Sequence, residues 1–88
     1  MIHELKTLPA YFVATLENRK LFEIRDNRDR GFQTGDTVIL REWEPGIIRG
    51  EYTGRSISAE ITYVSNYHQE VGYAVFGIKD LKIREFGK

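Results

Sequence analysis

Cysteine is absent from the 88 residues, and histidine occurs only twice, at His3 and His68. Without thiolates the chain can form neither disulfide bonds nor cysteine-rich zinc sites, which suits a reducing compartment. The two histidines lie far apart in the sequence, and isolated histidines of this kind are usually surface or core-edge residues. We therefore expect neither a metal ion nor another cofactor.

The chain also lacks a net charge of either sign, because 13 basic residues balance 13 acidic ones; its pI is about 6.7. The chain thus lacks the overall positive field that drives non-specific binding to nucleic acids, so any recognition of RNA or a nucleotide must be local. The first six residues include His3, Glu4 and Lys6 and hold no long apolar run. Neither a signal peptide nor a membrane span is expected there, and we expect a cytoplasmic chain.

Several catalytic motifs are missing as well. The eight glycines are scattered, and none has the spacing of a phosphate-binding loop or a dinucleotide-binding motif. The three serines Ser56, Ser58 and Ser65 lack the glycines of a nucleophile elbow. Nucleotide binding through a glycine-rich loop and serine hydrolysis of that type are therefore not favoured.

The residues that are present suffice for one domain over residues 1–88. Apolar residues make up 41% of the chain and charged residues 30%, as in ordinary small globular domains. Residues 1–6 are expected to form a short strand. Next, Thr7 as N-cap, Pro9 in the first turn and the spacing of Leu8, Phe12 and Leu16 predict an amphipathic helix. Glu17 and Asn18 end it, because Asn tolerates a left-handed backbone.

Strands are predicted at residues 21–24, 37–43, 56–64, 73–78 and 81–86, with a hairpin connection at 47–54 and a loop at 65–72. Strict alternation in the third of these strands places Ile57, Ala59, Ile61 and Tyr63 on one buried face. Gly77 indicates a bulge or a close approach of the backbone. The pattern predicts an α+β fold: a small, mostly antiparallel β-barrel with one N-terminal helix at its end, closed to remove strand edges.

The stretch 19–30 combines five basic and three acidic residues and is our candidate working surface. Alternation on a strand puts Glu23 and Arg25 on one face, with Phe22 and Ile24 anchoring the other face in the core. A lysine such as Lys20 can act as base or nucleophile, Glu23 can exchange protons, and Arg25 can clamp a phosphate. The same charges can also bind a base without reaction, or form a solvated surface with weak ion pairs.

Aromatic residues offer a second indication. Those that can either stack on an extruded base or cover the core are Tyr11, Trp43, Tyr52, Tyr63, Tyr67 and Tyr73.

Four segments resemble a family of small bacterial and phage proteins grouped with the ASCH domains of the PUA-like superfamily. They are H-E-L-K-T at 3–7, N-R-K-L-F-E-I-R at 18–25, F-Q-T-G-D at 32–36 and L-R-E-W at 40–43. The resemblance implies a PUA-like β-barrel with the helix beside a cleft, and recognition of RNA or a modified nucleoside in that cleft. Some ASCH proteins are amidohydrolases of N4-acylated cytidine that use a lysine, a threonine and a glutamate.

In that comparison the lysine corresponds to Lys20 and an arginine to Arg25, while the threonine position falls on Glu23. Glu70 is the nearest candidate, by order along the chain, for the second acidic group. Asn18 stands where the family usually has glycine.

Three functions remain open at this point. The first is an RNA- or nucleotide-binding module that uses Lys20, Glu23 and Arg25, with Lys6, Arg28 and Arg30 on the phosphate side. The second is a small amidohydrolase of acylated nucleosides, with Lys20 and Glu23 as catalytic residues. The third is a protein-interaction module of a phage or mobile element. We expect a monomer with RNA or a modified nucleoside as partner, and neither a membrane nor a metal.

Overall fold

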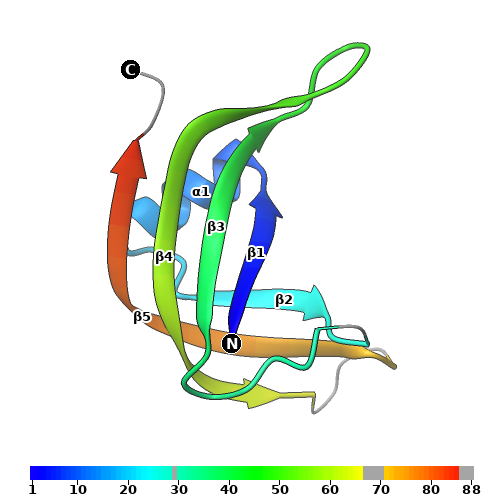
Figure 1. Cartoon of the computed structure of the whole chain (residues 1–88), viewed down its shortest axis with the longest axis vertical. Helices are drawn as coiled ribbons and strands as arrows, with labels where there is room; N and C mark the ends of the chain where they lie inside the picture. Colours follow the sequence, from blue (N-terminus) through cyan, green and yellow to red (C-terminus); the bar gives the residue numbers. More distant parts are fainter. Residues whose placement is uncertain (29, 67–70, 86–88) are drawn as a thin grey trace.

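The computed structural model describes residues 1–28, 30–66 and 71–85, and these form one curled five-stranded sheet with a single short helix (Figure 1). The strand order across the sheet is β1-β3-β4-β5-β2, so that β1 and β2 are the two edge strands. The elements in chain order are β1 (Ile2–Thr7), α1 (Pro9–Leu16), β2 (Phe22–Asp26), β3 (Thr37–Glu44), β4 (Glu51–Ser65) and β5 (Tyr73–Glu85).

β1 pairs with β3 in parallel, and the other three pairings are antiparallel. β4 and β5 are long and bent, with register shifts between Ser58 and Glu60 and between Ile61 and Tyr63. Such shifts increase local twist and bend a strand. Figure 1 shows the result: β2 and the first half of β5 lie across the upright β1 and β3. The sheet therefore curls into a half-barrel, which confirms the predicted α+β fold with a mostly antiparallel sheet. The predicted closure of the barrel is wrong, because β1 and β2 remain edge strands.

The core lies on the inner face of the half-barrel, where α1 covers the sheet. Alternation along β1 and β3, and in the middle of β4 from Ile57 to Ile61, buries every second residue, as the period-2 pattern requires. α1 contributes Phe12 to the core, and this side chain is completely buried. Replacing it by alanine would cost about 3–5 kcal/mol. The buried cluster consists of Leu5, Phe12, Phe32, Val38, Leu40, Ile57, Ala59, Ile61, Phe76 and Ile78.

The helix begins one residue later than predicted. β1 continues through Thr7, which pairs with Glu42 of β3 and therefore has a strand conformation. The buried hydroxyl of Thr7 donates to the carbonyl of Leu5 at 3.3 Å. Leu8 is the N-cap, without a side-chain cap, and Pro9 is the first helical residue. The prediction of Thr7 as N-cap was therefore wrong, because sheet pairing overrides its capping preference. The end is confirmed: Glu17 is the C-cap and Asn18 has a left-handed φ of 60°.

The inward and outward faces of β2 are reversed relative to the prediction. Phe22 and Ile24 are 45% and 51% exposed, whereas Glu23 is only 3% exposed. The prediction assumed that the apolar side chains Phe22 and Ile24 occupy the buried face of the strand. In the structure the edge strand turns Glu23 inward because Lys20 and Arg25 lie there to pair with its carboxylate.

Other boundaries also differ from the prediction. β4 begins at Glu51, inside the predicted hairpin connection at 47–54, so the strand is longer at its start than predicted. Tyr63 is 70% exposed because the register shift after Ile61 interrupts the alternation. The two predicted strands at 73–78 and 81–86 form one strand, β5, as far as Glu85. Tyr67, His68, Glu70 and Phe86 lie outside the described residues.

The described part of the chain contains no helix that is long and apolar enough to cross a membrane.

Candidate functional site

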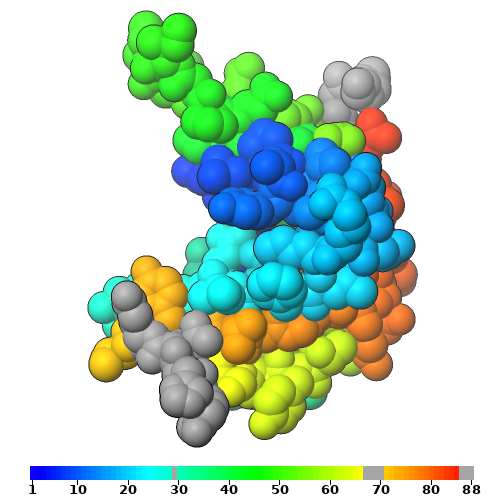
Figure 2. Space-filling view, turned by 180° about the vertical axis from the view of Figure 1, so that it is seen from behind, coloured from blue at the N-terminus to red at the C-terminus, as the bar shows by residue number. Residues whose placement is uncertain are grey.

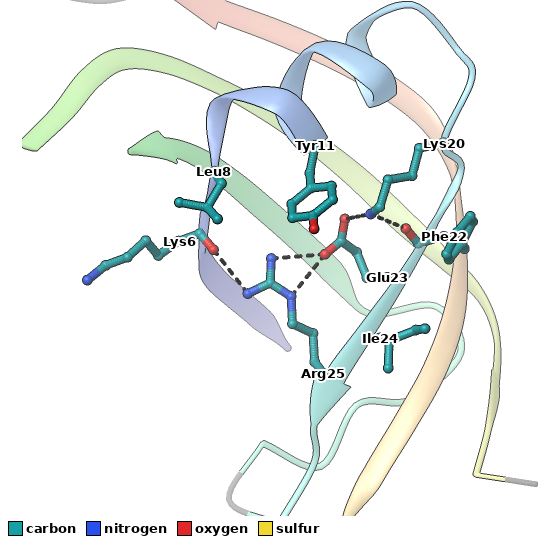
Figure 3. Close-up of a pocket in the computed structure, with 8 residues that line it drawn as sticks. All are labelled: Lys6, Leu8, Tyr11, Lys20, Phe22, Glu23, Ile24 and Arg25. Carbon is teal, nitrogen blue, oxygen red and sulfur yellow. Dashed lines mark hydrogen bonds and ion pairs between the residues drawn. The ribbon is translucent and has the colours of Figure 1, made fainter. Parts of the chain in front are cut away.

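A cleft of about 560 Å³ opens between the β1–α1 segment and β2. Seen from behind, the surface is hollowed between the dark blue N-terminal residues and the cyan residues of β2 (Figure 2). The side chains around it are drawn in Figure 3. The lining residues are Lys6, Leu8, Tyr11, Lys20, Phe22, Glu23, Ile24 and Arg25.

The carboxylate of Glu23 lies at the centre of this cleft and is held from both sides. Lys20 Nζ donates to Glu23 Oε2 at 2.5 Å, and Arg25 Nε donates to Oε1 at 2.9 Å. A second guanidinium nitrogen of Arg25 also lies 2.9 Å from Oε1. The structure therefore brings Lys20, Glu23 and Arg25 together, as the sequence predicted, with one buried anion between two cations.

The local sequence accounts for this convergence. The left-handed Asn18 turns the chain at the end of α1, and the next two backbone N–H groups, of Arg19 and Lys20, donate to the carbonyl of Ala14. This ties the backbone of Lys20 to the helix end immediately before β2. Because Glu23 and Arg25 are two residues apart on a strand, both point to the same side.

Arg25 also connects the two edge strands. Its NH1 donates to the backbone carbonyl of Lys6 at 3.0 Å, and its NH2 donates to Thr7 Oγ1 at 3.3 Å. Farther along the gap between the two edge strands, Arg30 NH1 donates to the carbonyl of Glu4 at 3.2 Å. Side chains from β2 and the loop after it thus bridge to β1, where an ordinary barrel would have a backbone ladder.

The rim of the cleft is apolar. Leu8 and Tyr11 come from the start of α1, and Phe22 and Ile24 come from β2; all four are substantially exposed. The ammonium of Lys20 lies 5.0 Å from the centre of the Phe22 ring and 5.8 Å from that of Tyr11. The cleft therefore combines an apolar rim with a charged floor.

Of the other predicted site residues, Lys6 lines the cleft, whereas Arg28 and Arg30 lie outside it. Lys6 contributes its backbone carbonyl, while its side chain points away (Figure 3) and places Nζ 4.2 Å from the centre of the Trp43 ring. Arg28 pairs with the carboxylate of Asp26, and this hydrogen bond lowers the pKa of Asp26 to about 2. Arg30 bridges to the carbonyl of Glu4 on β1. Neither Arg28 nor Arg30 lines the cleft.

Sequence reasoning identifies Tyr11 as a possible stacking residue but misses the rest of the apolar rim. The alternation pattern predicts Phe22 and Ile24 in the core, and the helical spacing accounts for Leu8 without a role in a site. A usable signal was the mixture of three charges with apolar residues on a short edge strand. Among the described residues, no three His, Asp or Glu side chains are grouped so that they could hold a metal ion.

A scan against family models matches residues 2–78 to the family described as "Domain of unknown function (DUF3850)". A relative from Escherichia phage P2, the "Uncharacterized 12.9 kDa protein in GpA 3'region", is 43% identical over 65 residues. This alignment covers 74% of the present chain but only 55% of the phage protein, so the chain spans about half the length of that relative. The family match includes every residue that lines the cleft. By that match, the chain belongs to the DUF3850 family.

Proposed function

We propose that the cleft binds a nucleobase of RNA or of a modified nucleoside, and that the half-barrel is a binding module of the PUA-like kind. The observation that carries this proposal is the buried carboxylate of Glu23, fixed between Lys20 and Arg25 beneath an apolar rim. Sites for small organic ligands generally have this composition, with apolar walls and a few fixed polar groups. A volume of about 560 Å³ is also within the usual range for them.

The polar floor offers a donor next to an acceptor. Each carboxylate oxygen can accept about two hydrogen bonds, and Glu23 Oε2 receives one, from Lys20. Lys20 has three hydrogens, and two of them serve Glu23 and the carbonyl of Phe22. The remaining capacity of the pair is one acceptor and one donor side by side. Base edges present the complementary pattern, for example the N4 amino group and N3 of cytosine.

The rim offers surfaces for stacking. Tyr11 and Phe22 carry flat rings and are 55% and 45% exposed at the mouth of the cleft. Stacking of an unpaired base on an aromatic side chain contributes about 1–3 kcal/mol. Removal of these rings should weaken a nucleobase ligand without unfolding a domain whose core lies elsewhere.

The arrangement favours binding over hydrolysis. A lysine that acts as a base or nucleophile needs a free lone pair. Lys20 instead donates to two acceptors, and Glu23 is neutralised by two cations. These contacts suit groups that hold a ligand. The amidohydrolase remains the competing assignment, because the lysine and the glutamate do share one cleft.

Calorimetric titration with cytidine, uridine, adenosine and N4-acetylcytidine tests the proposal. We expect at least one nucleoside to bind the wild type and to lose about tenfold or more in affinity with Tyr11→Ala. Arg19→Gln, which changes an exposed charge outside the cleft, is the matched control and should bind as the wild type does. Absence of binding by all four nucleosides and by short RNA would contradict the proposal. Release of acetate from N4-acetylcytidine that Lys20→Ala abolishes would assign the hydrolase instead.

A further inference from the structure

A second surface of mixed cations and aromatics lies on the outer face of the sheet, opposite α1. Lys6 Nζ lies 4.2 Å from the centre of the Trp43 ring, and the guanidinium carbon of Arg41 lies 3.9 Å from the centre of the Tyr52 ring. Trp43 of β3 and Tyr52 of β4 are direct partners across the strand pair, so they share a face. Two cation–aromatic stacks therefore lie next to each other.

This surface contains its own hollow, of about 530 Å³, which Arg41, Tyr52, Ser56, Ser58 and Arg84 help to line. The strand register explains why they meet. Arg41 of β3 lies opposite Ser56 of β4, and Ser56 lies opposite Arg84 of β5. Lys6 of β1 is the neighbour of Arg41 on the other side. Lys6, Arg41, Ser56 and Arg84 thus form one row across four adjacent strands, which are spaced about 4.8 Å apart.

The row is positively charged although the whole chain is neutral. The acidic residue that lines this hollow is Glu4, whose carboxylate is 3.5 Å from Arg41 in an exposed pair. Exposed pairs of this kind are weak, so Arg41 can exchange Glu4 for another anion. Arg55 also lines the hollow, but its guanidinium donates twice to the buried Glu42 and is already neutralised. A polyanion is therefore the ligand that the charge of this face fits.

The two hollows are adjacent. Lys6 lines the cleft, and Arg41, its neighbour on the next strand, lines the outer hollow. We propose that the outer face holds nucleotides that follow the one in the cleft, with Lys6, Arg41 and Arg84 contacting phosphates. Their bases can stack on Tyr52 or on the guanidinium plane of Arg41, as single-stranded RNA does on other proteins.

On this inference, which rests on the proposed function, the ligand is a single-stranded oligonucleotide rather than a free nucleoside.

Trp43 is the only tryptophan and reports directly on this face. We would titrate the wild type with cytidine 5′-monophosphate and with a six-nucleotide oligocytidylate, following both Trp43 fluorescence and amide chemical shifts of the cleft residues. The hexamer should bind at least tenfold more tightly and change the fluorescence, whereas the monophosphate should move only the amides. Oligoadenylate and oligouridylate hexamers, each with its monophosphate, serve as parallel probes in case the cleft prefers another base.

The double variant Arg41→Gln/Arg84→Gln tests the row itself. It should lower the affinity for the hexamer about tenfold or more. The slope of log affinity against log salt concentration should become shallower by about two, one for each lost phosphate contact, while the affinity for the monophosphate stays unchanged. Lys79→Gln removes an exposed cation of β5 that lines neither hollow and should change nothing.

The outcomes separate the two proposals. If the hexamer binds the double variant and the wild type equally while monophosphate binding is intact, the outer face does not bind the oligonucleotide and only the proposal for the cleft stands. If no monophosphate moves the cleft amides and a hexamer still binds through Arg41 and Arg84, the cleft does not bind a nucleobase. The proposed function is then rejected, together with the inference that one strand occupies both surfaces. Loss of hexamer binding both in the double variant and in Tyr11→Ala would support one strand spanning both surfaces.

Discussion

The guanidinium of Arg25 joins the carboxylate of Glu23 on β2 to the backbone carbonyl of Lys6 on β1, at 2.9 and 3.0 Å. One side chain therefore both organises the cleft and spans the gap between the two edges of the sheet. The rim residues of the cleft come from both sides of this gap, so the width of the cleft depends on the bridge. Stability and ligand binding are expected to be coupled at this residue.

Arg25→Lys should separate charge from geometry. Lysine keeps the positive charge but cannot hold Glu23 and the carbonyl of Lys6 with one planar fork. Loss of these charge-assisted hydrogen bonds should lower the free energy of unfolding by about 1.5–3 kcal/mol, measured by urea denaturation. Hydrogen exchange should speed up most in β1 and β2. Arg19→Lys, in an exposed pair with Glu17, is the control and should change stability by less than about 0.5 kcal/mol. Wild-type stability and exchange in Arg25→Lys would show that the bridge is unimportant.

Lys20 and Glu23 should be energetically coupled. Glu23→Gln leaves two cations facing each other without an anion, whereas Lys20→Met leaves Glu23 paired with Arg25. We therefore expect the first variant to lose more stability than the second. The double variant should lose less than the sum, with a coupling energy of about 1–3 kcal/mol. The exposed pair Glu17–Arg19 gives the reference cycle, expected below about 1 kcal/mol. Additive losses at Lys20 and Glu23 would contradict the geometry of the cleft floor.

The ion pair between Glu42 and Arg55 should make stability depend on pH. Hydrogen bonds from Arg55 lower the pKa of Glu42 below its ordinary value of 4.5 in the folded chain. A carboxylate with a lowered folded pKa stabilises the fold above its unfolded pKa, and this contribution is lost as the pH falls through the folded value. Glu42→Gln should thus cost about 1.5–3 kcal/mol at pH 7 and clearly less at pH 3.

Urea denaturation at both pH values measures this difference. Glu17→Gln removes a solvent-exposed carboxylate and is expected to have little effect at either pH. A penalty for Glu42→Gln that is the same at pH 3 and pH 7 would rule out the charge of Glu42 as its cause.

Gly77 should tolerate alanine only when its neighbour is shortened. A Cβ at this position would lie 2.6 Å from Thr62 Oγ1, closer than atoms can approach. Gly77→Ala in the wild type should therefore cost about 1–3 kcal/mol in unfolding free energy. With Thr62→Ala the obstruction is removed, and the same change should become neutral or stabilise slightly, because glycine is unfavourable in strands. An equal cost in both backgrounds would place the constraint somewhere other than at Thr62.

Local signals predicted the elements best. Pro9, the apolar spacing of the helix and the turn at Asn18 identified α1 and its end, and β-branched runs identified the strands. The bend of the sheet was not predictable, because the register shifts in β4 come from pairing with β5 and leave no local pattern. For that reason strict alternation predicts the wrong face for Tyr63.

The sequence predicts the charged residues of the site and one aromatic residue, Tyr11, but not its other apolar residues. Lys20, Glu23 and Arg25 are close in sequence, so their meeting required only a helix end and a strand. The face of β2 that carries Phe22 and Ile24 could not be inferred, since a buried Glu23 becomes favourable only with two cations arranged in space around it. The contact of Arg25 with Lys6 joins the two edge strands across the gap between them and also had no sequence signal.

The most direct test of the central claim is an amide chemical-shift titration of the wild type with nucleoside monophosphates and short single-stranded RNA. The account predicts that the largest changes fall on the residues that line the cleft, above all Tyr11, Phe22 and Glu23, and that Tyr11→Ala reduces them. Shifts that are absent, or that occur only in the β3–β4 connection at residues 45–50, would contradict it.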